Sequence, residues 1–126
     1  MSRIRLAPAP DGQGWSLRLT EAQDDLLRRA AEAFFALVSE GPGRVVALGP
    51  GGADLPGLLA AERVADADGF VSMSVTPEQL HAVHAMLMTL LVLVPSELSF
   101  MQQVGHFREQ AAALAAGLRR AGSRLA

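Results

Sequence analysis

The sequence predicts an α+β fold: a small, mainly antiparallel sheet of about four strands packed against helices, in the order ββαβ(α)βαα, with a C-terminal antiparallel helical hairpin. Two patterns support this prediction. Several short segments alternate polar and apolar residues, as half-buried strands do, and longer segments repeat apolar residues at spacings of three and four, as helices do. A chain of 126 residues is long enough for one modest core, so we expect a single domain, 1–126.

The N-terminal part of the chain predicts a β-hairpin followed by a helix. Arg3–Leu6 and Trp15–Leu19 both alternate, and the proline- and glycine-rich segment Ala7–Gly14 connects them. Thr20-Glu21-Ala22-Gln23 has the form of a capping box, which begins a helix that we expect to end at Gly41-Pro42. We expect this helix to expose an ordinary charged face made of Asp24, Asp25, Arg28, Arg29 and Glu32.

The middle of the chain predicts the two remaining strands. The apolar run Arg44–Leu48 is typical of a short buried strand, and Phe70–Val75 alternates as a half-exposed strand does. Between them, Asp54–Leu59 favours a short helical turn, and Glu62–Asp68 is polar. With the N-terminal hairpin, these strands complete the predicted sheet.

A glycine-rich turn, Gly49–Gly52, follows the third predicted strand. A strand, glycines and the start of a helix are the outline of a loop in which backbone N–H groups bind phosphate. Gly49, Gly51 and Gly52 are therefore candidates for binding an anion or a nucleotide. Asp54 stands where a dinucleotide-binding motif has its third glycine; its carboxylate would repel phosphate, although it could cap the following helix. A simple mobile turn is the alternative interpretation.

The stretch Thr76–Ala121 predicts two helices folded back on one another at Pro95-Ser96. Thr76 begins the first helix with a capping box and a proline at the first helical position. Ser96 can cap the second helix, and Gly122 can end it. Because both helices repeat apolar residues at alternating spacings of three and four, we expect them to pack antiparallel.

The first helix of this hairpin is apolar on nearly every side, so one neighbouring helix cannot bury it. We expect the sheet, a second subunit or a ligand to cover the remainder. The apolar segment Leu80–Val94 is shorter than the roughly 20 residues that a bilayer requires, so we predict no membrane span. The side chains that we predict at a protein interface are Met86, Leu90, Leu93, Phe100 and Phe107.

The composition excludes several classes of function. The chain has no cysteine, which excludes disulfides, thiolate catalysis and cysteine-based zinc sites. A formal net charge of −2 gives no electrostatic basis for binding nucleic acid. Arginine is used in place of lysine throughout, as is typical of a GC-rich bacterial genome, and we find no apolar export segment. We therefore expect a cytoplasmic bacterial protein that uses no cofactor.

Histidine is the residue type in this chain best suited to a metal site. His81 and His84 stand three apart on a predicted helix, a spacing that can bring both imidazoles to one ion, and Glu109 could supply a third ligand. His84 lies near the edge of the apolar face, so a histidine hydrogen-bonded to a neighbour is the simpler interpretation. We expect His106, among polar residues, to face water.

Two classes of function stay open. The first is a non-enzymatic interaction module that is homodimeric through the C-terminal hairpin or binds another protein, as adaptors, immunity proteins and chaperones do. The alternative is a small-molecule or metal-binding protein, or a small enzyme, with a pocket near His81 and His84. No motif typical of a catalytic nucleophile frames a serine, so we favour the interaction module and predict no enzyme.

Overall fold

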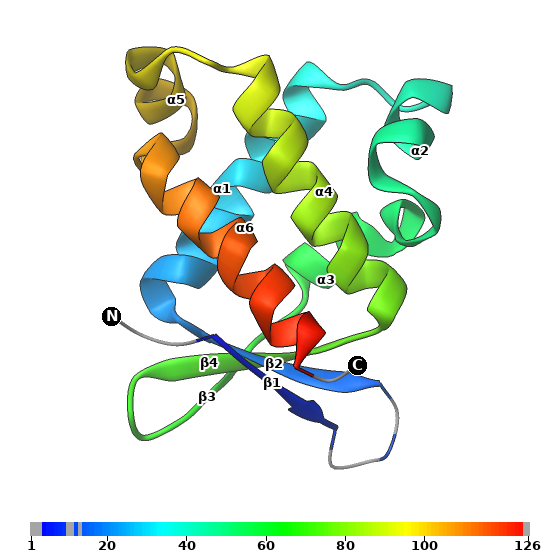
Figure 1. Ribbon diagram of the computed structural model, residues 1–126, viewed down its shortest axis with the longest axis vertical. Coiled ribbons are helices and arrows are strands. Elements are labelled where there is room, and N and C mark those ends of the chain that lie inside the picture. The colour runs from blue at the N-terminus through cyan, green and yellow to red at the C-terminus, as the bar shows by residue number, and fades with distance from the viewer. Residues whose placement is uncertain (1–3, 10–11, 13, 125–126) are drawn as a thin grey trace.

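The computed structural model describes residues 4–9, 12 and 14–124. It has an antiparallel sheet of strand order β1-β2-β4-β3, with helices on one face (Figure 1). The strands are β1 (Arg5–Pro8), β2 (Trp15–Thr20), β3 (Val64–Ala65) and β4 (Phe70–Val75). The predicted α+β fold is confirmed. Arg3 and three residues of the predicted hairpin connection, Pro10, Asp11 and Gln13, lie outside the described residues.

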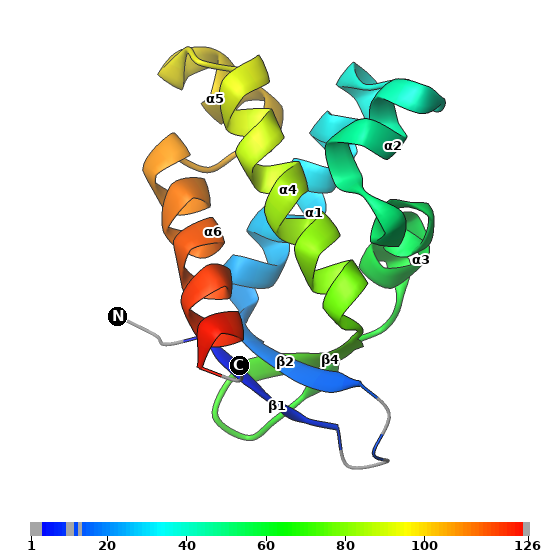
Figure 2. The same ribbon diagram turned by 45° about the vertical axis from the view of Figure 1, so that its right-hand side comes forward.

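The helices account for most of the described chain. They are α1 (Glu21–Leu37), α2 (Pro42–Leu48), the 3-10 helix η1 (Pro50–Asp54), α3 (Leu55–Ala60), α4 (Pro77–Leu93), α5 (Glu97–Val104) and α6 (Arg108–Ser123). Helices α4 and α6 lie side by side and run in opposite directions, with α1 behind them (Figures 1 and 2). Within the described residues, no helix combines the length and the apolar character needed to cross a membrane.

The alternation of the strands decides which face of the sheet the helices cover. The inward side chains of β2 and β4 are buried: Leu17, Leu19, Val71, Met73 and Val75. The opposite face is polar, and on it the guanidinium of Arg18 stacks on the Phe70 ring, 3.9 Å from its centre, and pairs with Asp66 at 2.9 Å. The sheet therefore has one packed face and one face open to solvent.

Helix α4 lies at the centre of the helical layer. It packs against α1, α2, η1, α3 and α6, and its inward side chains Met86, Leu87 and Leu90 have no exposed surface. The capping box predicted at Thr76 is present: the Thr76 hydroxyl accepts from the Gln79 N–H, and the Gln79 side chain accepts from the Thr76 N–H. A helix that is apolar on most sides is thus buried mainly by its own chain.

The strand predicted at Arg44–Leu48 is wrong, because this segment is helix α2. Pro42 occupies the first helical turn, and of the apolar run only Leu48 is fully buried, while Val45 and Val46 are 65% and 85% exposed. A short apolar run has no periodicity that separates a strand from a helix. The third strand along the chain is instead β3, Val64–Ala65, which lies within the segment Glu62–Asp68 that was predicted to be polar. It pairs with β4.

The second helix of the predicted hairpin is interrupted. It divides into α5 and α6 at Gly105, which takes the left-handed conformation (φ 77°) at the C-terminus of α5. The apolar repeat continues across this break because Phe100 and Val104 on α5, and Ala111 and Leu114 on α6, all face the same core. Periodicity alone therefore predicts one continuous helix, whereas Gly105 ends α5 and a separate helix, α6, follows it.

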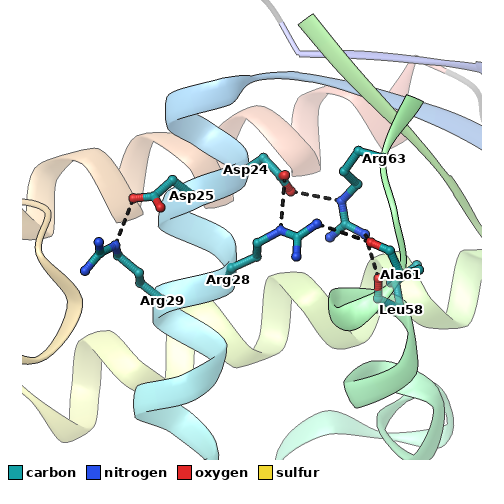
Figure 3. A network of polar contacts seen from close by, with 7 residues as sticks. All are labelled: Asp24, Asp25, Arg28, Arg29, Leu58, Ala61 and Arg63. Atoms are coloured by element: carbon teal, nitrogen blue, oxygen red, sulfur yellow. Dashed lines mark hydrogen bonds and ion pairs between the residues drawn. The ribbon is translucent and has the colours of Figure 1, made fainter. Parts of the chain in front are cut away.

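The charged face predicted for α1 also needs correction at one position. Asp24 is only 8% exposed, and its carboxylate accepts from Arg28 Nε at 3.3 Å and from Arg63 Nε at 3.0 Å (Figure 3). Arg63 donates through Nη1 to the carbonyls of Leu58 and Ala61, at 2.8 and 2.7 Å. This network fastens the end of α3 to α1. The next residue, Asp25, is half exposed, as predicted.

Replacing Asp24 with alanine should destabilise the fold far more than the same change at Asp25. The Asp24→Ala variant leaves the nearly buried Arg63 guanidinium without its carboxylate, a loss of about 3–5 kcal/mol for a buried pair. Asp25→Ala removes the contacts of a half-exposed carboxylate with Arg29 and His106, worth together about 1–2 kcal/mol. Urea unfolding of both variants measures the difference, and equal losses would contradict this account.

Candidate functional site

Large exposed apolar side chains gather at the end of the molecule that lies away from the sheet. There are nine such side chains in the described residues, and all except Val64 belong to α2, α5, the C-terminal halves of α1 and α4, or the α5–α6 junction. Figure 2 shows these segments at the end opposite the sheet. We call this set the distal apolar surface; it comprises Leu37, Val45, Val46, Met88, Val92, Leu93, Leu98 and Phe107.

The structure divides the predicted interface residues into two groups. Met86, Leu90 and Phe100 are fully buried within the chain, so they have no surface to offer a partner, and their assignment to an interface is wrong. Leu93 and Phe107 are 48% and 54% exposed and belong to the distal apolar surface. The sequence-based prediction assigned the most apolar side chains to the interface, whereas such side chains are the ones most often buried in the core of the same chain.

The outer face of α4 contributes the regular part of the distal apolar surface. Met88 and Val92 stand four residues apart, so they are neighbours on one face of the helix, and they are 45% and 76% exposed. His81 and Ala85 continue this face toward the sheet, where His81 is exposed and Ala85 half-buried. Met88 and Val92 therefore make the distal part of this face apolar, whereas Glu78 brings a carboxylate to its first turn, near the sheet.

His84 is placed beside this face but without a partner. Its Nε2 atom is buried and has no hydrogen-bond partner in the described structure, so the predicted hydrogen bond to a neighbour is absent. Burial lowers the pKa of His84 below its ordinary value, and the positive charge of Arg119 on α6 lowers it further. The surroundings of the imidazole therefore disfavour its protonated form.

The arrangement does not favour the predicted metal site at His81 and His84. The same arginine that lowers the pKa of His84 would repel a cation. Glu109, the suggested third ligand, instead lines a cavity between α1 and α6. No group of three or more histidine, aspartate and glutamate side chains in the described ranges could hold a metal ion.

The glycine turn packs against α4 and does not form an open anion loop. A Cβ on Gly51 would overlap the backbone carbonyl of Glu78 in the first turn of α4, and a Cβ on Gly52 would lie 2.6 Å from Leu48 Cβ. Gly49 adopts a positive φ of 73° beside the His81 ring. Asp54 precedes α3 but makes no side-chain capping bond. These glycines therefore allow close packing of η1, and the N–H groups of Gly49 and Gly52 already donate to the backbone carbonyls of Val45 and Gly49.

His106 does not face water as predicted. It lies at the α5–α6 junction with its side chain 16% exposed, and its Nε2 donates to the Asp25 carboxylate of α1 at 2.8 Å, since a carboxylate can only accept. This hydrogen bond holds the pKa of Asp25 below its ordinary value, with help from Arg29. The only sequence signal for this position was Gly105, which ends a helix and turns the next residue toward α1.

A cavity of about 540 Å³ lies between α1 and α6, and we call it the α1–α6 cavity. Its lining residues run along the whole of α6, from His106 just before the helix to Arg124 just after it, and the α1 side is formed by the first turns of that helix. Its polar lining comes mainly from α6 and the junction before it. Sequence reasoning missed this site; its one signal was the pair of arginines four residues apart near the end of α6. Its lining includes Ile4, Leu26, His106, Glu109, Ala113, Leu114, Gly117, Arg120 and Arg124.

Comparison with known proteins gives no match: no family model, no curated protein and no solved structure is similar to this chain. Function must therefore be inferred from the residues and their geometry.

Replacing Gly51 with alanine should destabilise the fold by about 1–3 kcal/mol, the typical cost of an added methyl group in a packed site, because the methyl group overlaps the Glu78 carbonyl. Gly57→Ala is the control, since a Cβ there meets nothing within 4 Å; alanine should stabilise α3 by about 0.5–1 kcal/mol. Thermal and urea unfolding report both changes. A Gly51→Ala variant as stable as the wild type would restore the open-loop interpretation.

The lowered pKa of His84 should make the folded state less stable as the pH falls from about 7.5 to 5.5. The unfolded chain binds a proton at His84 near pH 6.5, whereas the folded chain resists protonation, so acid favours unfolding in this range. The urea midpoint of the wild type should therefore decrease with falling pH, and a His84→Gln variant should show a smaller decrease. Between pH 7.5 and 8.5 neither protein should change. Identical slopes below pH 7 would contradict the assignment.

Proposed function

We propose that the protein is a non-enzymatic interaction module that forms a homodimer through its distal apolar surface. The observation that supports this proposal most is the unequal distribution of exposed apolar side chains: eight of nine in the described residues lie at one end of the molecule. A large apolar patch on a soluble domain is typical of a protein–protein contact, because leaving it in water is unfavourable.

A second copy is the partner that the outer face of α4 fits best. In a contact with two-fold symmetry, a surface meets an identical surface, so a charge on the axis would face its own copy and be repelled. Met88 and Val92 bring no charge to this face, and methionine adapts its shape to an opposing surface. Arg119 and His84 lie to one side of it, toward α6. The face is therefore suited to contact with itself.

The surrounding helices suit a docking surface as well. Val45 and Val46 on α2 are the most exposed valines next to α4, which α2 contacts directly. Leu98 and Phe107 extend the apolar character to the other side of the same end. We place this dimer in the bacterial cytoplasm on the basis of composition, and adaptors, immunity proteins and chaperones are the kinds of protein that the proposal includes.

Replacing Val92 with glutamate should weaken the dimer by at least tenfold, because each protomer would bring a charge into an apolar contact, at a cost of more than about 1.4 kcal/mol. The substitution is compatible with the fold, since Val92 is 76% exposed and glutamate favours helices more than valine does. Light scattering over a wide dilution series measures the change in mass.

Val64→Glu is the matched control for this experiment. The exposed fraction of Val64 is 74%, close to the 76% of Val92, but Val64 lies on β3 at the opposite end of the molecule. The dimer of this variant should have the same dissociation constant as the wild-type dimer. A wild-type protein that is monomeric at every concentration, or two variants with equal effects, would contradict dimerisation through the distal apolar surface.

A further inference from the structure

The α1–α6 cavity has the size and the floor of a small-molecule site. Its volume of about 540 Å³ falls within the range of about 300–1,000 Å³ typical of such sites. The floor is formed by Ile4, Leu26 and Leu114, each of which is nearly buried. Because the lining is mainly apolar, a ligand that fills the cavity must bring an apolar body of its own.

The charges around the cavity favour an anion. Arg120 on α6 and Arg124, which directly follows the helix, stand four residues apart, and Glu109 is the one carboxylate in the lining, so these three residues give a net charge of +1 in a chain whose net charge is −2. Among the ion pairs within residues 4–9, 12 and 14–124, neither arginine has a partner. Their guanidinium donors are therefore available to a carboxylate or a phosphate.

Gly117 allows one of these guanidinium groups to lie over the floor. A Cβ on Gly117 would be 2.6 Å from Ile4 Cδ1 and 3.9 Å from Arg120 Nη2. The absence of a side chain thus lets Ile4 approach α6 and leaves the Arg120 guanidinium directly beside the apolar floor. An apolar body and a charged group of one ligand can then be bound next to each other.

The C-terminus of α6 opposes an anion at this end of the cavity, but only weakly. A helix C-terminus has a partial charge of about −0.5, and its effect is confined to the last turn. Two full positive charges on long side chains outweigh it. At the other end, Glu109 would repel an anion, and His106 is already bonded to Asp25. The end of the cavity at Arg120 and Arg124 therefore favours an anion, and the end at Glu109 does not.

We propose that the α1–α6 cavity binds an amphipathic anion, in which Arg120 and Arg124 hold one carboxylate or phosphate group and the floor covers an apolar body. The length of that body follows from the helix: Ala113 and Arg120, which both line the cavity, are seven residues apart, or about 10 Å along α6. A medium-length acyl carboxylate meets both requirements.

Sodium decanoate, titrated into the full chain by isothermal calorimetry below its micelle concentration, tests the site directly. Decanoate should bind one molecule per chain. Decylammonium has the same tail with the opposite charge and should bind roughly tenfold more weakly or not at all, and butyrate has the same charge without the tail and should also bind weakly. Equal binding of decanoate and decylammonium, or no saturable binding of decanoate, would overturn the proposal.

Substitutions in α6 test the position of the charged group. An Arg120→Gln, Arg124→Gln double variant should lose roughly tenfold or more in decanoate affinity, because the charge-assisted hydrogen bonds are removed while the helix is kept. Arg119→Gln is the matched control, since Arg119 is exposed on the same helix but does not line the cavity. Equal losses in both proteins would assign the effect to overall charge and overturn the site.

Two alanines provide a second, uncharged test. Ala113 lines the cavity and Ala112 does not, and both are exposed on α6, so phenylalanine at either position should leave the fold intact. Ala113→Phe should block decanoate binding, whereas Ala112→Phe should bind as the wild type does. Binding that survives in Ala113→Phe would place decanoate elsewhere and overturn the proposal.

Discussion

The burial of α4 is the constraint on which the rest of this structure depends. An almost wholly apolar helix cannot lie on a surface, so the chain surrounds it with α1, α2, η1, α3 and α6 and seats its first turn against the glycines of η1. Met86 and Leu90 are completely enclosed as a result. The cover fails only along the outer face and at the C-terminal end of the helix, where Met88 and Val92 stay exposed. Met88, Val92 and Leu93, which α4 contributes to the distal apolar surface, are thus the part of this helix that one chain does not cover.

Arginine side chains complete this layer by capping helix ends from outside. Helices α1, α3 and α4 have no basic residue in their own last turn. The carbonyl that follows α1 accepts from Arg44, the last carbonyls of α3 accept from Arg63, and those of α4 accept from Arg108. In each case a cation from outside the helix meets its negative end and satisfies a carbonyl left without an N–H partner. Composition alone attributes the use of arginine to genome bias. In this structure the several N–H donors of the planar guanidinium group are used to bind carbonyls at helix ends.

The elements with local signals could be predicted, and those that depend on distant contacts could not. The capping boxes at Thr20 and Thr76 satisfy backbone groups three residues away, so the sequence contains both partners. Helix α2 and strand β3 depend on what α4 and β4 offer them, which no local pattern records. The same holds for the candidate sites. His106 meets Asp25 across 81 residues, and Arg120 lies over Ile4 from the far end of the chain. The three buried residues of the predicted interface failed for a related reason: apolar character predicts that a side chain is buried but does not say whether its own chain or a partner buries it.

The α5–α6 junction relates the two proposed surfaces. Phe107 belongs to the distal apolar surface, and its neighbour His106 lines the α1–α6 cavity and is bonded to α1. Arg108 then donates to the carbonyls at the end of α4. A protomer docked on Phe107 would restrict a junction that is anchored on both sides by these bonds, and of these three residues only His106 lines the cavity that a ligand would occupy. Coupling between two sites is reciprocal, so any effect of the ligand on dimerisation must equal the effect of dimerisation on the ligand. The short, doubly anchored junction is the element through which such coupling would pass.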